Sequence, residues 1–390
     1  MNTWDVVVIG AGAAGMMCAI EAGRRGRRVL VVERNRKPGE KIRISGGGRC
    51  NFTNLNVAGG TYLSANPKFA LSALSRYTPK DFIALVKRHD IAFHDKGAGQ
   101  LFCTHFAQEI IDMLVDEIRA AGVTLRLGVE TGAITRTADG FAVDLDGETV
   151  TAEALVIATG GKSIPKMGAT PFGYRVAEQF GLRQVETRPA LVPLTFDPGF
   201  LKIYGALSGV SLPARVTCGK TSFAEDLLFT HRGLSGPAIL QISSFWREGQ
   251  EISIDMMPGR DALDLLKLVR AGPGKREAVG ILSEWLPHRL AQVIAADFPG
   301  RVGEMKDKTL SDLAARLKDW RIKPTGTEGY RTAEVTLGGV DTRDLDAKTM
   351  QARKVPGLYF VGEVIDVTGW LGGYNFQWAW ASGFAAGQVV

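Results

Sequence analysis

The stretch DVVVIGAGAAG at residues 5–15 decides the fold of this chain. Its first five residues form a short apolar run rich in β-branched side chains, which is typical of a buried strand. Glycines at positions 10, 12 and 15 follow directly, and residues 16–22 then carry apolar side chains at helical spacing. A second apolar run at residues 29–32 ends in Glu33. This order of strand, glycine turn, helix, strand and acid predicts a βαβ unit that binds a dinucleotide.

The glycines and the acid of this unit each have a physical role. Gly10 allows a tight turn out of the strand, Gly12 leaves room for a pyrophosphate, and Gly15 lets the helix pack close to the sheet. The helix N-terminus offers free N–H groups and a positive dipole end to the phosphates. Glu33 is placed to accept hydrogen bonds from the adenosine ribose. The alternative is a glycine-rich turn that binds nothing.

Composition indicates an ordinary globular protein. The chain has 390 residues, enough for two domains or for one large domain with an insertion, and 45% of them are hydrophobic. No apolar run approaches the length of a membrane span, about 20 residues, and the N-terminus lacks a basic segment before a signal core. We therefore expect a cytoplasmic protein without membrane contact. The four cysteines are far apart and form no CxxC pair, so neither a disulfide framework nor a metal site is expected.

The net charge of +6 comes mainly from two basic clusters, at residues 24–28 and 37–49. A basic surface could attract nucleic acid. However, the first cluster is typical of a solvated helix end, and the second is better placed to face an anionic cofactor. No RNA- or DNA-binding module is recognisable. We therefore expect a small-molecule substrate and do not expect a nucleic-acid partner, while the oligomeric state stays open.

Residues 34–54 are expected to form an irregular loop, because the run Gly46-Gly47-Gly48 disfavours helix and strand. Lys41 and Arg49 flank these glycines, so the loop backbone could lie against a planar or anionic ligand. A flexible surface loop is the alternative, but apolar residues such as Ile42 and Phe52 anchor both flanks.

Helical spacing recurs at residues 67–77, 79–89 and 107–121, and a hairpin is expected at 93–102. Strands at 123–129, 133–137, 141–145 and 149–151 resemble the meander often inserted in dinucleotide-binding domains, and a buried strand at 153–159 follows. Short strands at 191–196, 211–218, 227–230, 239–244 and 251–256 predict a small antiparallel sheet or barrel. Helices are then expected at 262–271, 276–285, 288–297 and 310–320, before a strand at 332–337.

These patterns predict an α/β protein with two domains. Residues 1–189 and 331–390 are assigned to a discontinuous nucleotide-binding domain, which ends with a strand at 357–363 and a helix at 376–389. Residues 190–330 are assigned to an inserted domain, β-rich at 190–258 and helical at 261–320.

Three features favour FAD over NAD as the resident cofactor. The buried strand ends in Gly160-Gly161, which resembles the second FAD-contact motif of the glutathione-reductase-like fold. A later strand ends in Gly362-Glu363, where such folds carry a Gly-Asp pair that contacts the ribityl chain, with Asp366 as an alternative acid. Gly372-Gly373 opens the last helix, whose N–H groups could stabilise negative charge on a reduced flavin. A second glycine fingerprint and a redox cysteine pair are both missing from the sequence.

Three longer blocks make the resemblance specific. They are KIRISGGGRCNFTN at 41–54, LFTHRGLSGP at 228–237 and GEVIDVTGWLGGYN at 362–375. Together they resemble the BaiN/YhiN-type bacterial flavoproteins, known as NAD(P)/FAD-dependent oxidoreductases or as the aminoacetone oxidase family. The resemblance covers nearly the whole chain. It implies a Rossmann-like, glutathione-reductase-like FAD fold with an inserted β-barrel-like and helical domain over the flavin, and leaves the substrate mostly unassigned.

The chain departs from that family pattern at two places. It reads Met-Gln-Ala-Arg at 350–353, where the family tends to carry Met-Glu-Ser-Lys. Cys103 follows Phe102 where the family tends to carry proline. Neither departure touches the FAD fingerprint, but both put local substrate or nicotinamide contacts in doubt.

The resemblance also implies roles for individual residues around the cofactor. Those that would hold the pyrophosphate are Gly10, Gly12, Ala13, Ala14 and Gly15. Those at the adenosine end are Glu33, Arg34 and, through its backbone, Val129. Those on the phosphate-to-flavin side are Lys41, Ser45, Gly46, Gly47 and Arg49. Those that complete the flavin pocket are Gly160, Gly362, Glu363, Gly373, Tyr374 and Asn375.

The expected chemistry is hydride transfer through flavin N5 to or from a small or polycyclic organic substrate, with NAD(P)H as a visiting reductant. His231 and Tyr374 are the candidate proton donors. The alternatives are a loop histidine held by backbone groups and a tyrosine packed at the helix start. Cys50 could have a lowered pKa beside Arg49, although a structural thiol is the alternative.

Two other functions stay open. One is a flavoenzyme that acts on RNA, similar to the tRNA-modifying flavoproteins, which only the positive charge supports. The other is a non-enzymatic FAD-binding protein, in which the flavin is a structural or sensing element.

Overall fold

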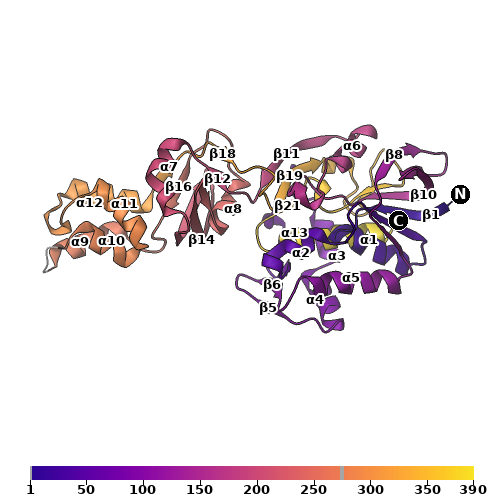
Figure 1. Ribbon diagram of the computed structural model, residues 1–390, viewed down its shortest axis with the longest axis horizontal. Helices are drawn as coiled ribbons and strands as arrows, with labels where there is room; N and C mark the ends of the chain where they lie inside the picture. Colours follow the sequence, from indigo (N-terminus) through magenta and orange to yellow (C-terminus); the bar gives the residue numbers. More distant parts are fainter. Residues whose placement is uncertain (1, 273–275) are drawn as a thin grey trace. The chain divides into compact units, whose positions relative to one another are not determined.

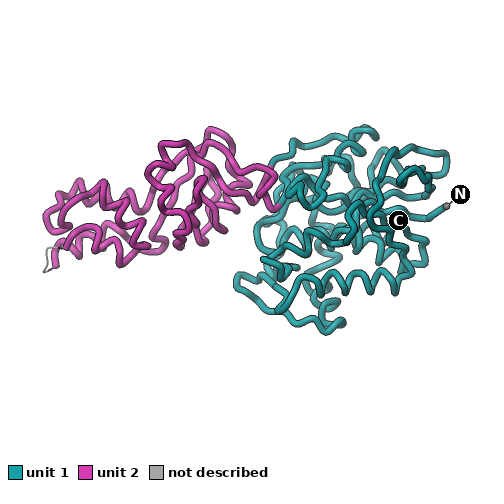
Figure 2. Tube along the Cα trace, in the orientation of Figure 1, with its two compact units in different colours: residues 1–188, 335–390 teal, residues 189–334 magenta. Residues whose placement is uncertain are grey.

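The computed structural model describes residues 2–272 and 276–390, and they divide into two compact units (Figure 2). Unit 1 comprises Met1–Arg188 and Val335–Val390, and unit 2 comprises Pro189–Glu334. Residues 273–275, which fall in the predicted helical stretch 261–320, lie outside the described residues. Among the described residues, no helix is long and apolar enough to cross a membrane.

Unit 1 is built on a sheet with the strand order β7-β2-β1-β10-β9-β8, in which β20 also pairs with β10. Strands β1, β8 and β10 of this sheet are labelled in Figure 1. The parallel strands are β1 (Asn2–Ile9), β2 (Val29–Glu33), β7 (Thr124–Leu127), β10 (Glu148–Ile157) and β20 (Leu358–Phe360). The antiparallel strands are β8 (Thr131–Arg136) and β9 (Phe141–Leu145). Residues 6–8 of β1 are fully buried, which explains their unbroken apolar run.

One strand replaces two predicted ones in this sheet. The segments expected at 149–151 and 153–159 belong to the single strand β10. The first half of β10 pairs with β9 and its second half with β20, so the strand changes neighbours without a turn. The sequence contains no glycine or proline between them, so the division had no turn residue to support it.

Helices and smaller sheets complete unit 1. The helices are α1 (Ala13–Arg24), α2 (Glu40–Gly48), α3 (Leu71–Arg76), α4 (Pro79–Arg88), α5 (Gln108–Ala120), α6 (Phe172–Gln179) and α13 (Tyr374–Gly387). The small sheets pair β3 (Asn51–Asn54) with β6 (Gln100–Cys103) and β5 (Phe93–Asp95), β4 (Tyr62–Leu63) with β21 (Thr368–Gly369), and β11 (Gln184–Ala190) with β19 (Val335–Val340). The short 3₁₀ helices are η1 (Gly59–Thr61), η2 (Pro165–Met167), η5 (Thr342–Asp344) and η6 (Gly362–Val364). The hairpin predicted at 93–102 is confirmed as β5 and β6, whereas the helix predicted at 67–77 is shorter.

The expected irregular loop at 34–54 is partly wrong, because it contains a helical turn and a strand. Residues 40–44 are helical, and the helix then breaks where Ser45 takes ψ 150° and Gly46 and Gly47 take φ +58° and +68°. The glycines therefore end the helix rather than prevent it, and buried Ile42 anchors it to the core.

Two helices at the centre of unit 1 pack so closely that glycine is required between them. A Cβ on Gly383 of α13 would lie 2.4 Å from the carbonyl oxygen of Ala14 in α1, and one on Gly387 would lie 2.7 Å from that of Cys18. Both contacts advance by four residues in the same direction, so the two helices are parallel. Helix α13 starts nine residues before Gly383, whereas α1 starts one residue before Ala14. At a rise of about 1.5 Å per residue, the N-terminus of α13 therefore projects about 12 Å past the N-terminus of α1.

Unit 2 combines an antiparallel sheet with helices. The strand order is β17-β16-β13-β14-β15-β12-β18. The strands are β12 (Leu194–Thr195), β13 (Ser211–Cys218), β14 (Thr221–Thr230), β15 (Gly233–Ser235), β16 (Ile252–Asp255), β17 (Trp320–Ile322) and β18 (Gly326–Thr327). The helices are α7 (Pro198–Tyr204), α8 (Pro237–Ser243), α9 (Ala262–Ala271), α10 (Ala278–Trp285), α11 (His288–Asp297) and α12 (Asp307–Lys318), with 3₁₀ helices η3 (Gly205–Leu207) and η4 (Val302–Glu304).

The strand predicted at 239–244 is wrong, because this segment is helix α8. Gly236 turns the chain with φ +86°, and Pro237 occupies the first turn, where its fixed φ suits a helix. The short apolar run could not by itself separate strand from buried helix.

The contact between α1 and α13 predicts a stability effect. Gly383→Ala places a Cβ against backbone, which cannot move aside as a flexible side chain can. We expect the free energy of unfolding to fall by about 2 kcal/mol, since overpacking outweighs the gain in helix propensity. Gly280→Ala is the matched control, because its Cβ would meet no atom within 4 Å. Thermal melting compares the two, and a Gly383→Ala melt at or above that of the parent would contradict the expectation.

Candidate functional site

The glycine fingerprint joins β1 to α1 in unit 1, and two of its glycines are required by packing. The N–H of Gly10 donates to the carbonyl of Val32 at 2.8 Å. A Cβ on Gly10 would lie 2.5 Å from the carbonyl oxygen of Ala158, and one on Gly15 would lie 2.0 Å from that of Gly10. The close packing of helix on sheet predicted for Gly15 is therefore confirmed.

Gly12 differs from its two neighbours in the fingerprint. A Cβ there would meet no protein atom within 4 Å, and its φ of −86° is open to any residue. In the described chain no side chain caps the N-terminus of α1, so its first N–H groups are available to an anion. Nearby at the end of β10, the Thr159 hydroxyl is buried without a hydrogen-bond partner among the described residues. These features fit the pyrophosphate of FAD, which a Cβ at position 12 would obstruct.

The residues predicted for the adenosine end lie together where β2 ends. One carboxylate oxygen of Glu33 accepts a hydrogen bond from the N–H of Ala11 at 3.0 Å. The N–H of Val129 donates to the carbonyl of Glu33 at 3.0 Å, so the Val129 carbonyl is the backbone group left to meet a ligand. Arg34 forms an ion pair with Glu130 at 3.1 Å. The fingerprint, Glu33 and Val129 are thus connected through hydrogen bonds.

Glu363 is the centre of a polar network that joins four separate segments of unit 1. Its Oε2 accepts from Lys41 Nζ at 2.8 Å, and its Oε1 accepts from the Ser163 hydroxyl at 3.1 Å and the Thr336 N–H at 3.0 Å. Lys41 Nζ also donates to Ser163 Oγ at 3.0 Å. A Cβ on Gly160 would lie 3.9 Å from the Glu363 carboxylate. The structure therefore brings Lys41, Gly160 and Glu363 together, as a single site requires.

Sequence reasoning missed two members of this network, Ser163 and Thr336, which are both fully buried. The only signal for Ser163 was its place two residues after Gly161, and Thr336 carried none. The alternative acid, Asp366, has a different role, because its carboxylate accepts from the N–H of Ala65 at 2.7 Å and is 2% exposed. Burial raises the pKa of Asp366.

The start of α13 is held against β3 by contacts that only glycine permits. Gly373 has φ +91°, and a Cβ on it would lie 2.4 Å from the carbonyl oxygen of Thr53. The Asn54 amide donates to the carbonyl of Gly372 at 2.8 Å. These contacts fix the direction of the helix N-terminus that the sequence assigns to the flavin.

Two residues predicted for the flavin pocket use their polar groups within the protein. The Asn375 amide accepts from the N–H of Gly369 at 2.8 Å and donates to its carbonyl at 3.0 Å. The N–H of Gly362 donates to Ser382 Oγ, and its carbonyl accepts from the indole of Trp378, both at 3.0 Å. Both residues therefore shape the start of α13 and the turn after β20.

The glycine loop, residues 45–48 at the non-helical end of α2, is held from one side only. A Cβ on Gly46 would lie 2.7 Å from the Phe102 ring, whereas one on Gly47 would meet no atom within 4 Å. The Ser45 hydroxyl donates to the carbonyl of Ile42 at 2.8 Å, which closes the helical turn. Arg49 is exposed. The Gly47 backbone and the Arg49 side chain are thus open toward a ligand.

The candidate proton donors differ in their surroundings. Tyr374 is 7% exposed, and its carbonyl accepts from the Tyr62 hydroxyl at 3.0 Å. His231 is exposed in the turn between β14 and β15 of unit 2. The lowered pKa suggested for Cys50 is wrong, because this thiol is fully buried and burial raises its pKa.

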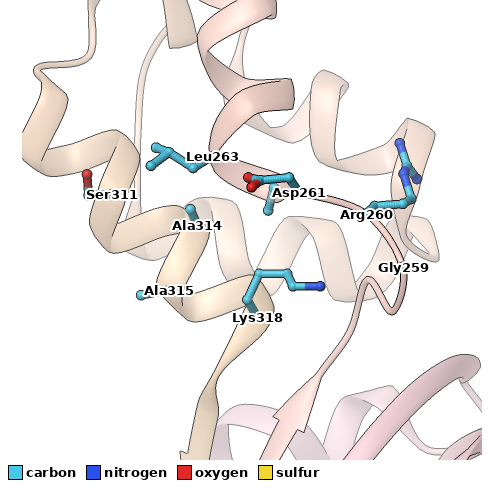
Figure 3. Close-up of a pocket in the computed structure, with 9 residues that line it drawn as sticks. Gly259, Arg260, Asp261, Leu263, Ser311, Ala314, Ala315 and Lys318 are labelled. Carbon is cyan, nitrogen blue, oxygen red and sulfur yellow. The ribbon is translucent and has the colours of Figure 1, made fainter.

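Unit 2 contains a groove of about 530 Å³ between the start of α9 and helix α12 (Figure 3). The Lys318 side chain on its wall is already hydrogen-bonded within the protein, because its Nζ donates to Asp255 Oδ2 and to the carbonyl of Met257, both at 2.7 Å. Arg260 lies over the Trp285 ring at 5.5 Å.

Over residues 2–272 and 276–390, no group of three His, Cys, Asp or Glu residues could hold a metal ion.

Three curated proteins resemble this chain from end to end. Ribosomal RNA dihydrouridine synthase of Escherichia coli is 53% identical, over 100% of this chain and 98% of that protein. Ribosomal RNA dihydrouridine synthase of Haemophilus influenzae is 44% identical, over 98% of each. The 3-dehydro-bile acid delta(4,6)-reductase of Clostridium scindens is 30% identical, again over 98% of each.

A solved structure shares the fold at low sequence identity. The 3-ketosteroid-delta4-(5alpha)-dehydrogenase of Rhodococcus jostii aligns with a TM-score of 0.50 and 15% identity, over 99% of this chain and 97% of that one. The family model described as HI0933-like protein Rossmann domain matches residues 4–389. The predicted Rossmann-type FAD-binding fold is confirmed, and the chain belongs to the HI0933-like family of FAD-binding oxidoreductases.

Proposed function

We propose that this protein is an FAD-dependent reductase that converts uridine in ribosomal RNA to dihydrouridine. The observation that carries the proposal is the end-to-end similarity, at 53% and 44% identity, to two proteins named for that activity. The fingerprint at residues 10–15, with its open position at Gly12, supports a bound dinucleotide as the redox group.

The expectation that nucleic acid is not a partner is wrong. Two full-length relatives are named for ribosomal RNA. The interpretation first kept as an alternative, a flavoenzyme acting on RNA, is therefore the better one, with ribosomal RNA in place of tRNA. The net charge of +6 was too small to decide between the two.

The proposed reaction reduces the C5–C6 double bond of uracil, which is conjugated to the C4 carbonyl. Reduced FAD, when bound, supplies the hydride chemistry. The hydride adds to C6, a proton adds to C5, and NAD(P)H provides the two electrons and becomes NAD(P)⁺. The protein must hold the uracil ring in place, exclude water and deliver one proton.

The residues proposed to hold FAD follow the geometry of unit 1. The N-terminus of α1 at Gly12 would receive the pyrophosphate, and Glu33 would receive the adenosine ribose. Lys41 and Glu363 would face the chain between the phosphates and the flavin, because their network joins α2 to the turn after β20. The N-terminus of α13 at Gly373 would stabilise negative charge on the reduced flavin.

The proton donor is proposed to be His231 rather than Tyr374. The Tyr374 side chain is buried against Tyr62, with ring centroids 6.2 Å apart, so it is better suited to holding the helix start. His231 is exposed and lies in one of the three blocks that carry the family resemblance.

A second candidate is the reduction of a polycyclic enone. The bile acid reductase, at 30% identity, supports it. A 3-oxo substrate with a conjugated double bond poses the same chemical task as uracil, namely hydride addition to the far carbon of a conjugated system. The lower identity makes this candidate the weaker of the two.

The proposed activity predicts a specific product. Purified protein with FAD is mixed anaerobically with NADH or NADPH and with ribosomal RNA from cells that lack the gene. The flavin absorbance should bleach on mixing with the nicotinamide, and nucleoside mass spectrometry should find uridine heavier by two hydrogen atoms. Transfer RNA from the same cells is the control substrate. Flavin reduction without dihydrouridine in ribosomal RNA would contradict the proposal.

The pyrophosphate site predicts the effect of Gly12→Val. The side chain would occupy the place of the phosphates, so FAD retention should fall at least ~10-fold, which corresponds to about 1.4 kcal/mol. Because a Cβ there meets no protein atom, the melting temperature of the FAD-free protein should be unchanged. Flavin absorbance per protein gives the measurement, and Gly12→Ala should show a smaller loss. A variant that purifies with full FAD would disprove the pyrophosphate role.

The assignment of His231 predicts a selective loss of turnover. His231→Ala should bind FAD and accept electrons from NAD(P)H normally, but form dihydrouridine about 100-fold more slowly, as expected for loss of a general acid. His288→Ala, another exposed histidine of unit 2, is the control. Equal dihydrouridine rates for both variants would return His231 to a purely structural role.

A further inference from the structure

An aromatic and basic surface lies on unit 1 next to the glycine loop at the end of α2. We define the hairpin surface as the exposed residues Arg49, His94, Lys96, His105 and Phe106, beneath which the ring of Phe102 is buried. It covers the β5–β6 hairpin and the segment that leads into α5 (Figure 1). We propose that this surface binds the single-stranded RNA that flanks the target uridine, a proposal that rests on the proposed function.

Backbone hydrogen bonds hold this surface to the loop assigned to the flavin side. The N–H of Cys103 donates to the carbonyl of Arg49 at 2.9 Å, and the N–H of Ala107 donates to that of Gly48 at 2.7 Å. The Phe102 ring fills the space where Gly46 lacks a side chain. An RNA strand bound to the hairpin surface would therefore lie beside the glycine loop.

The aromatic rings of the surface suit nucleic acid bases. Phe106 is 70% exposed, although its ring gains nothing from water. His94 stacks on Phe102 with ring centroids 6.2 Å apart and planes 21° from parallel, and Lys96 Nζ lies 5.1 Å from the same ring. Phe102 is buried, so it supports His94 and Lys96 from beneath, and Phe106 is the exposed phenylalanine ring available for stacking. Single-strand binders stack bases on such exposed aromatic rings and bind the backbone with nearby cations.

The charges around the rings favour a polyanion over a protein partner. Neither Arg49 nor Lys96 takes part in any ion pair among the described residues, whereas Arg43 nearby pairs with Glu40. The two adjacent carboxylates are turned to the backbone, with Asp95 accepting from the N–H of Gly97 at 2.7 Å and Glu109 from that of Phe106 at 3.4 Å. Arg49 and Lys96 are thus cations that no described carboxylate pairs with, and such cations match phosphates.

Two substitutions test the surface in the full-length, FAD-loaded protein. The probe is a fluorescein-labelled twelve-nucleotide oligouridylate, and binding is followed by anisotropy at several salt concentrations. Phe106→Ala should weaken binding ~10-fold, as expected for loss of one base stack. Lys96→Ala should weaken binding and lower the salt slope by about 1, as expected for loss of one phosphate contact.

Matched controls are exposed residues outside the surface. Leu268→Ala removes an apolar side chain that is 69% exposed in unit 2, and Lys348→Ala removes an exposed lysine in unit 1. Both should bind the probe within ~2-fold of the parent, as is usual for residues outside a contact. FAD content, melting temperature and the rate of flavin reduction by NAD(P)H should be unchanged in all four variants.

The outcomes separate this proposal from the proposed function. If the parent forms dihydrouridine in ribosomal RNA but Phe106→Ala and Lys96→Ala bind the probe and react like the controls, the surface proposal is wrong and the function stands. If the parent neither binds the probe nor modifies ribosomal RNA, both proposals fail. A selective loss of RNA binding and of dihydrouridine formation in these two variants supports both.

Discussion

The parallel packing of α1 against α13 is the constraint on which the rest of unit 1 depends. Two parallel helices place like dipole ends on the same side, about half a positive charge at each N-terminus, which is unfavourable without a counter-charge. The backbone contacts at Gly383 and Gly387 nevertheless hold them together. The proposed FAD would relieve this conflict, because the N-terminus of α1 would receive its pyrophosphate and the N-terminus of α13 its reduced flavin.

The network around Glu363 gives this arrangement its second support. Lys41, Ser163 and Thr336 come from three different segments and all bind one carboxylate. A shorter aspartate would have to shift the turn after β20 to reach the same three donors, which explains the extra methylene relative to the Gly-Asp pair of related folds. The network therefore fixes the position of the turn relative to Lys41 in α2.

The sequence predicted local patterns well and distant partners poorly. Strand β1, the glycine turn and helix α1 were legible because β-branched runs, glycine spacing and helical periodicity are local signals. The hydrogen-bond partners of Glu363 could not be predicted from local signals, because Lys41 lies 322 residues away and Ser163 lies 200 residues away. Helix α8 was predicted as a strand because a segment as short as 239–244, with Ile239, Leu240 and Ile242 as its apolar residues, fits either structure, and only the conformation at Gly236 decides between them.

The error about nucleic acid has a physical cause in how charge was counted. Most cations of the basic cluster at 24–28 hold the molecule together: Arg27 pairs with Glu153, Arg28 pairs with Asp5, and Arg25 donates to the carbonyl of Val390 at the chain's end. They add to the net charge but offer little to a polyanion. In the second cluster Arg49 has no ion pair among the described residues. Nucleic acid binding depends on the few outward-facing cations that lie beside exposed aromatic rings. The net charge of the whole chain does not show where those cations are.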